Sequence, residues 1–293
     1  MKYYLTKNLK SKFKKQIYLE FQNQLNTEKV LNIIQIGQNL SSTQYVNLKQ
    51  KIGGDLGIEV NLLEYGESVN LNEIKNELKL KKEGQGLIIQ LPIPDKFMNL
   101  LSDREIWNNR LDVDFLTSFK RDEYFNYGVL PPTIQGIDLI IRQTFLSQEF
   151  ELKNLETKIN LQGVVVGVVG QGRLVGGFML NYLKERESTI VSLNQYSKEI
   201  KNLIQDCDIL ITATGQKGLV KSSMINSFKT KLIIDVGSSE QEGSVYGDLD
   251  YEDFEINSDK FPDLIICPSK GGVGPLTVLS LFWGLSKLMS FNL

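Results

Sequence analysis

Short apolar segments that end in glycine alternate with helix-like segments along most of this chain, and this alternation limits the fold more than any other feature. In the first half, strand-like runs cover residues 29–37 (KVLNIIQIG), 57–65 (GIEVNLLEY) and 84–94 (GQGLIIQLPIP). Helical patterns lie between them, at residues 44–51 and 70–82. Strands that alternate with helices form βαβ units and a parallel sheet, so we predict an α/β fold.

The same pattern restarts in the second half. Residues 163–185 (GVVVGVVGQGRLVGGFMLNYLKE) read as a strand, a glycine-rich turn and a helix, and apolar strands follow at residues 188–194, 208–215 and 231–239. This half is typical of a Rossmann-type doubly wound parallel sheet. At 293 residues the chain has room for two domains of roughly 100 to 200 residues each. We predict a catalytic domain over residues 1–140, completed by a C-terminal helix at 276–293, and a dinucleotide-binding domain over 141–275.

Composition excludes several classes of partner. The net charge of −2 gives no basic footprint for nucleic acid, and no apolar run reaches the ~18 to 20 residues of a membrane helix, so we expect neither partner. The two cysteines, Cys207 and Cys267, have no CxxC spacing and no histidine beside which to form a zinc site, so we expect no metal. We interpret both as reduced thiols, which favours an intracellular, cytoplasmic location.

The glycines of the second half point to a nucleotide. Gly170, Gly172 and Gly176 stand directly after a strand and before a helix, where glycine lets backbone N–H groups approach a pyrophosphate. The next strand ends at Asn194, near the usual place of the acid that binds the ribose of NAD. Arg173 and Lys198 are candidates for a phosphate contact and equally for solvated surface charge, so these residues leave NAD and NADP open.

The chain has no histidine, so another side chain must carry out any proton transfer near neutral pH. Tyr45 and Lys49 are four residues apart in a helical pattern and share one face, whereas Lys51 lies off that face. A partly buried lysine with a shifted pKa suits proton transfer. By spacing alone, a solvated amphipathic helix explains the pair better.

Several segments, in order, resemble the bifunctional methylenetetrahydrofolate dehydrogenase/cyclohydrolase family. The resemblance runs from about Leu31 to Thr277, and YVxxK, QLPxP, DVD and GGVGPxT together are far more specific than a glycine turn. The matching segments are IGQNLSSTQYVNLKQKIGGDLGI, GLIIQLPIP, LDVDFLTS, PPTIQGIDLI, GQGRLVGG, DILITATGQ, IIDVGSS, GDLDYED and PSKGGVGPLT.

This resemblance implies two domains with a folate-binding cleft between them. It also implies oxidation of 5,10-methylene-tetrahydrofolate to the 5,10-methenyl form, and hydrolysis of that product to 10-formyl-tetrahydrofolate. The implied cofactor is NADP, with NAD not excluded, and the implied assembly is a homodimer. Position by position, the implied catalytic residues are Lys49, Tyr45 and Gln90; the substrate-binding residues are Tyr45, Gln90, Asp114, Gly271, Gly272 and Pro275; and the cofactor-binding residues are Gly170, Gln171, Gly172, Arg173, Gly176, Asn194, Thr214 and Gly215.

The cofactor loop departs from the family pattern, which usually reads GRSxxVGxP. Gln171 replaces the arginine associated with the cofactor phosphate, Gly172 replaces serine, and Asn194 replaces the histidine of a His-Ser pair. We expect retained activity with altered affinity. Two alternatives stay open: another two-domain dehydrogenase resembling shikimate dehydrogenase, which does not account for YVxxK with QLPxP, and a catalytically silent folate-binding relative.

Overall fold

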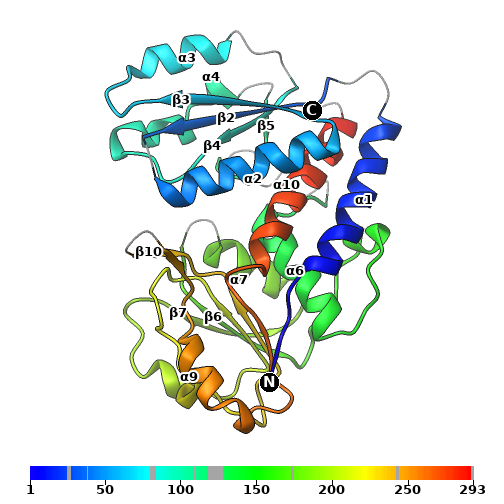
Figure 1. Cartoon of the computed structure of the whole chain (residues 1–293), viewed down its shortest axis with the longest axis vertical. Helices are drawn as coiled ribbons and strands as arrows, with labels where there is room; N and C mark the ends of the chain where they lie inside the picture. Colours follow the sequence, from blue (N-terminus) through cyan, green and yellow to red (C-terminus); the bar gives the residue numbers. More distant parts are fainter. Residues whose placement is uncertain are drawn as a thin grey trace. The chain divides into compact units, whose positions relative to one another are not determined.

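A computed structural model of the chain contains two compact units, each built on its own parallel sheet (Figure 1). The described residues are 1–24, 28–37, 39–79, 84–107, 110–117, 128–172, 175–241 and 244–291. The first unit contains Phe13–Pro132 and Val278–Leu293, and the second contains Met1–Lys12 and Thr133–Thr277. The predicted fold class, two α/β domains of which one has a Rossmann-type sheet, is confirmed. The boundary predicted after residue 140 falls inside helix α6 (Pro132–Thr144).

The first unit has a four-stranded sheet in the order β3-β2-β4-β5, with every pair parallel. Each strand is short, β2 and β4 are buried along their whole length, and the helices between strands return the chain to the same edge of the sheet. Its elements are β2 (Val30–Ile36), α2 (Leu40–Leu56), β3 (Glu59–Tyr65), α3 (Leu71–Lys79), β4 (Gly86–Ile89), the 3-10 helix η1 (Asp95–Leu101), α4 (Arg104–Trp107) and β5 (Leu111–Asp112).

Side chains of β2 alternate between two apolar layers. Ile34 and Ile36 join a buried cluster that includes residues of α3, η1 and α4. On the opposite face, Gly86 lies beside Leu31 and against Leu285 of α10 (Val273–Ser290), which makes the C-terminal helix part of this core. Full burial of an aliphatic side chain contributes roughly 1.5 to 3 kcal/mol, so these two layers hold β4, and the loop after it, in a fixed place.

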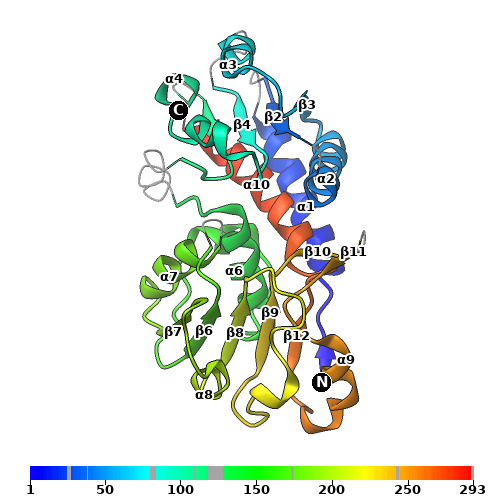
Figure 2. The ribbon, with the colours of Figure 1, turned by 90° about the vertical axis from the view of Figure 1, so that its left-hand side faces the viewer.

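The second unit has a six-stranded parallel sheet in the order β1-β12-β9-β8-β6-β7. Figure 2 shows β7, β6, β8, β9 and β12 side by side in that sequence. The elements are β1 (Lys2–Tyr3), η2 (Leu152–Glu156), β6 (Val165–Val169), α7 (Gly176–Lys184), β7 (Thr189–Leu193), α8 (Ile200–Ile204), β8 (Ile209–Thr212), η3 (Ser222–Met224), β9 (Leu232–Asp235), the antiparallel pair β10 (Ser239–Gln241) and β11 (Ser244–Tyr246), α9 (Tyr251–Ile256), η4 (Ser258–Lys260) and β12 (Ile265–Cys267).

The strand order of the second unit reverses at one point. The chain proceeds from β6 outward to β7, then crosses back to β8 on the other side of β6. The order therefore reverses between β6 and β8, and α/β sheets bind ligands outside the carboxyl ends of the strands at such a point. The loops that begin at Gly170 and Ala213 meet there: a Cβ added to Gly170 would lie 2.4 Å from the Ala213 carbonyl oxygen.

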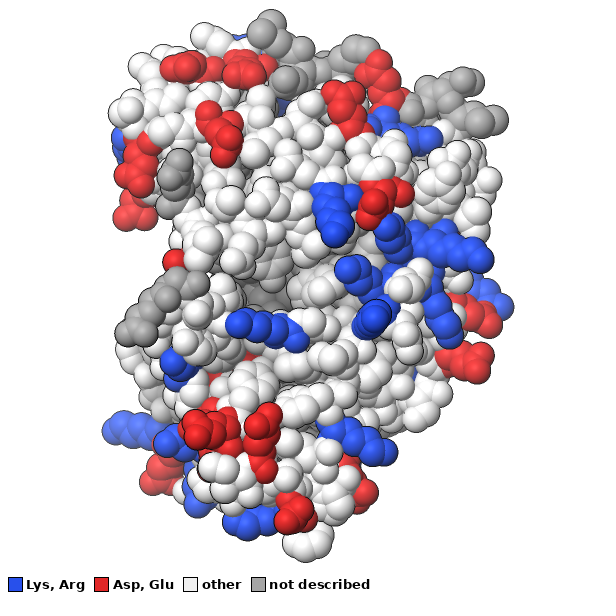
Figure 3. Space-filling model, viewed as in Figure 1, with Lys and Arg blue, Asp and Glu red and all other residues white. Residues whose placement is uncertain are grey.

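The N-terminal region forms a short strand and a helix with one buried face. Lys2 and Tyr3 form a short strand that pairs with β12, a contact that no local pattern indicates. Helix α1 (Lys7–Asn23) follows, and its Leu9, Phe13, Ile17 and Phe21 are buried at four-residue spacing. Figure 3 shows Lys and Arg side chains gathered where α1 reaches the surface. The helix is therefore amphipathic.

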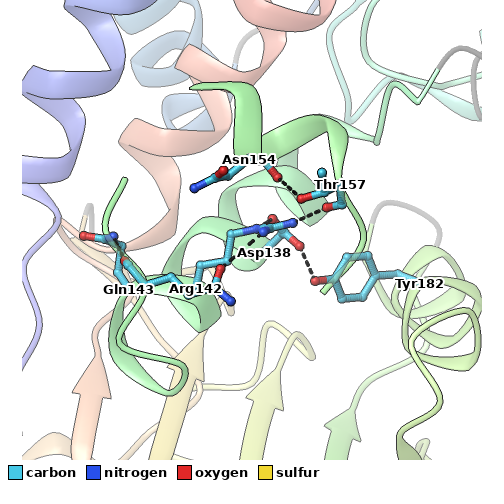
Figure 4. Close-up of polar contacts among 7 residues, drawn as sticks. Asp138, Arg142, Gln143, Asn154, Thr157 and Tyr182 are labelled. Carbon is cyan, nitrogen blue, oxygen red and sulfur yellow. Dashed lines mark hydrogen bonds and ion pairs between the residues drawn. The ribbon is translucent and has the colours of Figure 1, made fainter. Parts of the chain in front are cut away.

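A buried polar network holds α6 against α7 within the second unit (Figure 4). Asp138 accepts hydrogen bonds from Tyr182 Oη at 2.5 Å and from Arg142 Nε at 2.6 Å. Arg142 also donates to the Thr157 carbonyl oxygen, and the guanidinium of Arg186 lies 3.6 Å from the centre of the Tyr182 ring. Because the buried carboxylate is paired on both oxygens, the network fixes how α7 meets α6.

Among the described residues, α10 is long and apolar enough to cross a membrane, and 72% of this stretch is buried inside the protein. That is the pattern of a core helix.

Candidate active site

Helix α2 positions the tyrosine and lysine of the YVxxK motif. Asn39 caps its first turn by accepting a hydrogen bond from the Ser42 backbone N–H at 2.9 Å, and Gly57 ends it in a left-handed conformation with φ 75°. Within this helix Tyr45 and Lys49 are one turn apart on one face. Lys49 is only 4% exposed.

The structure brings Lys49 together with two other predicted site residues of the first unit. Lys49 Nζ donates a hydrogen bond to Gln90 Oε1 at 2.8 Å. Its ammonium also lies 3.9 Å from Asp114 Oδ2, at the distance of a loose ion pair. A buried amine, an amide oxygen and a carboxylate therefore meet at the carboxyl end of β4.

Burial shifts the ionisation of both motif side chains. It lowers the pKa of Lys49, because the charged form loses its water, and the neighbouring Asp114 charge opposes this shift. The pKa of Tyr45 is raised, first by burial and then by the Asp114 charge. The phenol therefore stays neutral and able to donate a hydrogen bond, while Lys49 exchanges its proton more readily than a solvated lysine.

The turn after β4 is held from two sides. Gln90 Nε2 donates to the Leu91 carbonyl oxygen at 2.9 Å, and Ser42 Oγ donates to the same oxygen at 3.0 Å. With its NH2 group used in this way, Gln90 presents its oxygen to Lys49. Ser42 was not predicted as part of the site, although it stands one turn before Tyr45 at the start of α2.

Asp112 anchors the loop that carries Asp114. Its carboxylate accepts hydrogen bonds from the backbone N–H groups of Leu116 at 3.1 Å and Thr117 at 2.7 Å, and from the Thr117 hydroxyl at 2.8 Å. The side chain is fully buried, and burial raises its pKa to about 6 despite these bonds. The sequence signal for Asp112 is the DVD motif, in which Asp112 is the buried aspartate two residues before Asp114.

The Asp114 charge should set the pH dependence of Lys49. Because this charge raises the pKa of the amine, Asp114→Asn should lower the pKa of Lys49 further. The acid limb of cyclohydrolase kcat against pH, measured at saturating folate, should then move to lower pH. Asp55→Asn is the control. Asp55 lies on the same helix as Lys49 but pairs with Lys14, so its loss should leave the acid limb in place. A limb that moves to higher pH in Asp114→Asn would contradict the assigned electrostatics.

The glycine loop of the second unit leaves no room for a side chain at Gly170 or Gly176. A Cβ on Gly176 would lie 2.3 Å from the Gly170 carbonyl oxygen and 2.4 Å from Gln171 Cα, whereas one on Gly177 would meet nothing within 4 Å. Gly170 has φ 105°, which glycine alone adopts without strain. The loop therefore brings its backbone close to the start of α7, as a dinucleotide pyrophosphate requires.

The end of β7 carries neutral groups. Gln171 Nε2 donates to Ser192 Oγ at 2.7 Å, and Asn194 Nδ2 donates to Gln171 Oε1 at 3.4 Å. Lys198 is exposed. Arg173 lies outside the described residues, and Gly172 has open space beside it. This arrangement suits hydrogen bonds to ribose hydroxyls.

The remaining predicted residues lie on two other loops of the second unit and at the start of α10. Thr214 and Gly215 follow β8, beside the glycine loop, and Gly215 has φ 69°. Gly271 and Gly272 follow β12, where their carbonyl oxygens accept hydrogen bonds from the Thr6 hydroxyl at 3.0 and 2.9 Å. Pro275 lies in the first turn of α10. Thr6 was not predicted and has no sequence signal.

Comparison with known proteins gives a consistent result. The family description "Tetrahydrofolate dehydrogenase/cyclohydrolase, catalytic domain" matches residues 4–113, and "Tetrahydrofolate dehydrogenase/cyclohydrolase, NAD(P)-binding domain" matches residues 152–292. "Bifunctional protein FolD" of Sulfurihydrogenibium sp. is 31% identical over 96% of this chain and 95% of its own length. The protein of the same name from Methanococcoides burtonii is 30% identical over 86% and 82%. A FolD methylenetetrahydrofolate dehydrogenase/cyclohydrolase from Campylobacter jejuni superposes with TM-score 0.78 and 26% identity over all of both chains.

Proposed function

Because this chain belongs to the tetrahydrofolate dehydrogenase/cyclohydrolase family, we propose that it carries out both reactions of that family. It oxidises 5,10-methylene-tetrahydrofolate to 5,10-methenyl-tetrahydrofolate with NAD(P)+ and hydrolyses the methenyl form to 10-formyl-tetrahydrofolate. The observation that carries the proposal is the Lys49 amine, buried at 2.8 Å from Gln90 Oε1 in a chain without histidine.

Hydrolysis adds water to the carbon of the methenyl bridge, breaks one of its bonds to nitrogen and releases a proton. Lys49 is the group that moves the proton, because burial lowers the pKa of its amine. Gln90 fixes the direction of the amine through its hydrogen bond, and the nearby Asp114 carboxylate favours the charged form of the amine. Tyr45, a neutral phenol beside them, donates a hydrogen bond to the folate.

The second unit would bind the nicotinamide cofactor that oxidation needs. The turn at Gly170 and Gly176, where a Cβ would collide with backbone, fits a dinucleotide pyrophosphate. A nicotinamide cofactor bound there would supply the acceptor for the hydride that leaves the methylene carbon. Hydride transfer requires correct positioning of the two reactants and no strong base.

A paired assay tests the oxidation. Purified protein mixed with 5,10-methylene-tetrahydrofolate should form reduced cofactor with NADP or with NAD, and the methenyl product should be hydrolysed further. Formation of no reduced cofactor with either would sink the dehydrogenase assignment. Folate binding without turnover would identify a catalytically silent relative instead.

Cofactor choice depends on the neutral residues at the end of β7. NADP is the cofactor that the family resemblance implies, and NAD fits as well, because Gln171, Ser192 and Asn194 carry no charge. A 2′-phosphate gains a charge-assisted hydrogen bond from arginine. Gln171→Arg should therefore raise the ratio of kcat/KM for NADP over NAD by about tenfold. Asn181→Arg, a charge added on the exposed side of α7, is the control and should leave this ratio unchanged.

We extend the proposal to assembly and location. The family resemblance supports a homodimer, which light scattering should detect as twice the 33.3 kDa chain mass. Both cysteines are free and buried, which supports a cytoplasmic location.

A further inference from the structure

Two buried aspartates lie beneath the ligand-binding edge of the second unit, and neither has a role in the reactions described so far. Asp235 ends β9, and Asp248 follows β11. Both side chains are fully buried, although ionised acids are rarely buried without strong partners. Their partners lie on the loops that carry predicted cofactor-binding and folate-binding residues.

Asp248 holds the loop that follows β8. Its Oδ2 accepts a hydrogen bond from the Thr214 backbone N–H at 2.6 Å, and its Oδ1 accepts one from the Gln216 backbone N–H at 2.9 Å. A Cβ on Gly237 would lie 2.1 Å from the Asp248 carboxylate, so glycine there lets the carboxylate approach. This loop is adjacent to the glycine turn at the point where the strand order reverses.

Asp235 joins that loop to the one that follows β12. One of its oxygens, Oδ1, accepts hydrogen bonds from Thr212 Oγ1 at 3.2 Å, from the Gly237 N–H at 3.0 Å and from the Asp248 N–H at 3.1 Å. The other, Oδ2, accepts from Tyr251 Oη at 2.6 Å. The carboxylate therefore connects the ends of β8 and β9 to α9.

Tyr251 extends this chain to the loop with Gly271 and Gly272. Its hydroxyl oxygen accepts a hydrogen bond from the Ser269 backbone N–H at 2.8 Å while its proton is donated to Asp235. Ser269 Oγ in turn donates to the Gly237 carbonyl oxygen at 2.7 Å. One connected set of hydrogen bonds thus reaches both the cofactor loop and the folate loop.

We propose that Asp235, Asp248 and Tyr251 are positioning residues with separable effects: Asp248 sets the loop 213–216 for the nicotinamide cofactor, Tyr251 sets the loop 268–272 for the folate, and Asp235 couples the two. This inference rests on the proposed function of the two loops. Charge-assisted hydrogen bonds to backbone N–H groups are stronger than neutral ones, so their loss should displace a loop measurably.

Two variants separate the effects. Asp248→Asn replaces one acceptor oxygen with an NH2 group that faces a backbone donor, so it should raise the KM and the Kd of the nicotinamide cofactor by about tenfold or more. Tyr251→Phe removes both hydroxyl bonds and should raise the KM of methylene- and methenyl-tetrahydrofolate, while the cofactor Kd changes much less. Tyr3→Phe is the matched control, because the Tyr3 ring lies 6.3 Å from that of Tyr251 and its hydroxyl contacts exposed Glu255.

Thermal unfolding of each variant checks its fold. If Asp248→Asn does not fold, Thr212→Val takes its place. It removes the hydrogen bond from Thr212 to Asp235 at the end of β8, where the loop 213–216 begins. Equal rises of cofactor and folate KM in both variants, or lower Tm with every KM unchanged, would overturn the proposal and indicate a purely structural network. Cofactor Kd is measured by direct titration without folate, so its result stands apart from the activity assay: an inactive wild-type protein would refute the proposed function, not this inference.

Discussion

Replacing Lys49 by alanine will lower cyclohydrolase kcat by roughly 100- to 10,000-fold, the range typical of a lost proton-transfer group. The substrate is 5,10-methenyl-tetrahydrofolate without nicotinamide cofactor, so only hydrolysis is measured. The loss is large because Lys49 is the buried amine of the site and the chain has no histidine to replace it.

Lys51→Ala is the matched control. Lys51 stands on the same helix two residues on, off the shared face, and is exposed. It should leave hydrolysis unchanged. Lys49→Met keeps most of the side-chain volume without the amine and should be as inactive as Lys49→Ala, which separates lost chemistry from lost packing. Hydrolysis at the wild-type rate in both Lys49 variants would refute the role of this amine.

Gly176→Ala will lower dehydrogenase kcat/KM on the order of 100-fold, because a small displacement of a reactant removes much of the advantage of fixed orientation. The added Cβ would lie 2.3 Å from the Gly170 carbonyl oxygen, so the cofactor turn and the start of α7 must separate. Hydrolysis of methenyl-tetrahydrofolate needs no nicotinamide cofactor and should be far less affected. The measurement is the ratio of the two activities in one preparation.

Gly177→Ala is an adjacent control in the same helix. A Cβ there meets nothing within 4 Å, and the residue has no positive φ, so the ratio of activities should match that of the wild type. If Gly176→Ala also keeps the wild-type ratio, the glycine turn does not carry the cofactor.

The predictable part of this protein is local. Alternation of short apolar runs with helices located β2, β3 and β4 of the first sheet and β6 to β9 of the second, and the i, i+4 spacing placed Tyr45 and Lys49 on one face of α2. The contact of Lys49 with Gln90 joins residues 41 positions apart, and spacing alone favoured a solvated lysine. Only the resemblance of several motifs to one family predicted it.

Contacts between distant segments account for the features that the sequence patterns did not predict. The strand at Lys2 and Tyr3 is too short to show a period of two, and it forms because β12 offers a free edge. Asp235 ends β9 and Asp248 follows β11, and many of their partners are backbone N–H groups, which no side-chain pattern reveals. The anchoring role of Asp112 likewise depends on the path of the backbone through Leu116 and Thr117.

The stoichiometry of product formation tests the central claim most directly. Wild-type protein supplied with 5,10-methylene-tetrahydrofolate and an excess of NADP or NAD should yield one 10-formyl-tetrahydrofolate for each reduced cofactor, with the methenyl form present only transiently. Spectrophotometry of the reduced cofactor, with chromatography of the folates, measures both. Reduced cofactor with methenyl-tetrahydrofolate accumulating no differently from an enzyme-free control would contradict a bifunctional enzyme, and so would 10-formyl product without reduced cofactor.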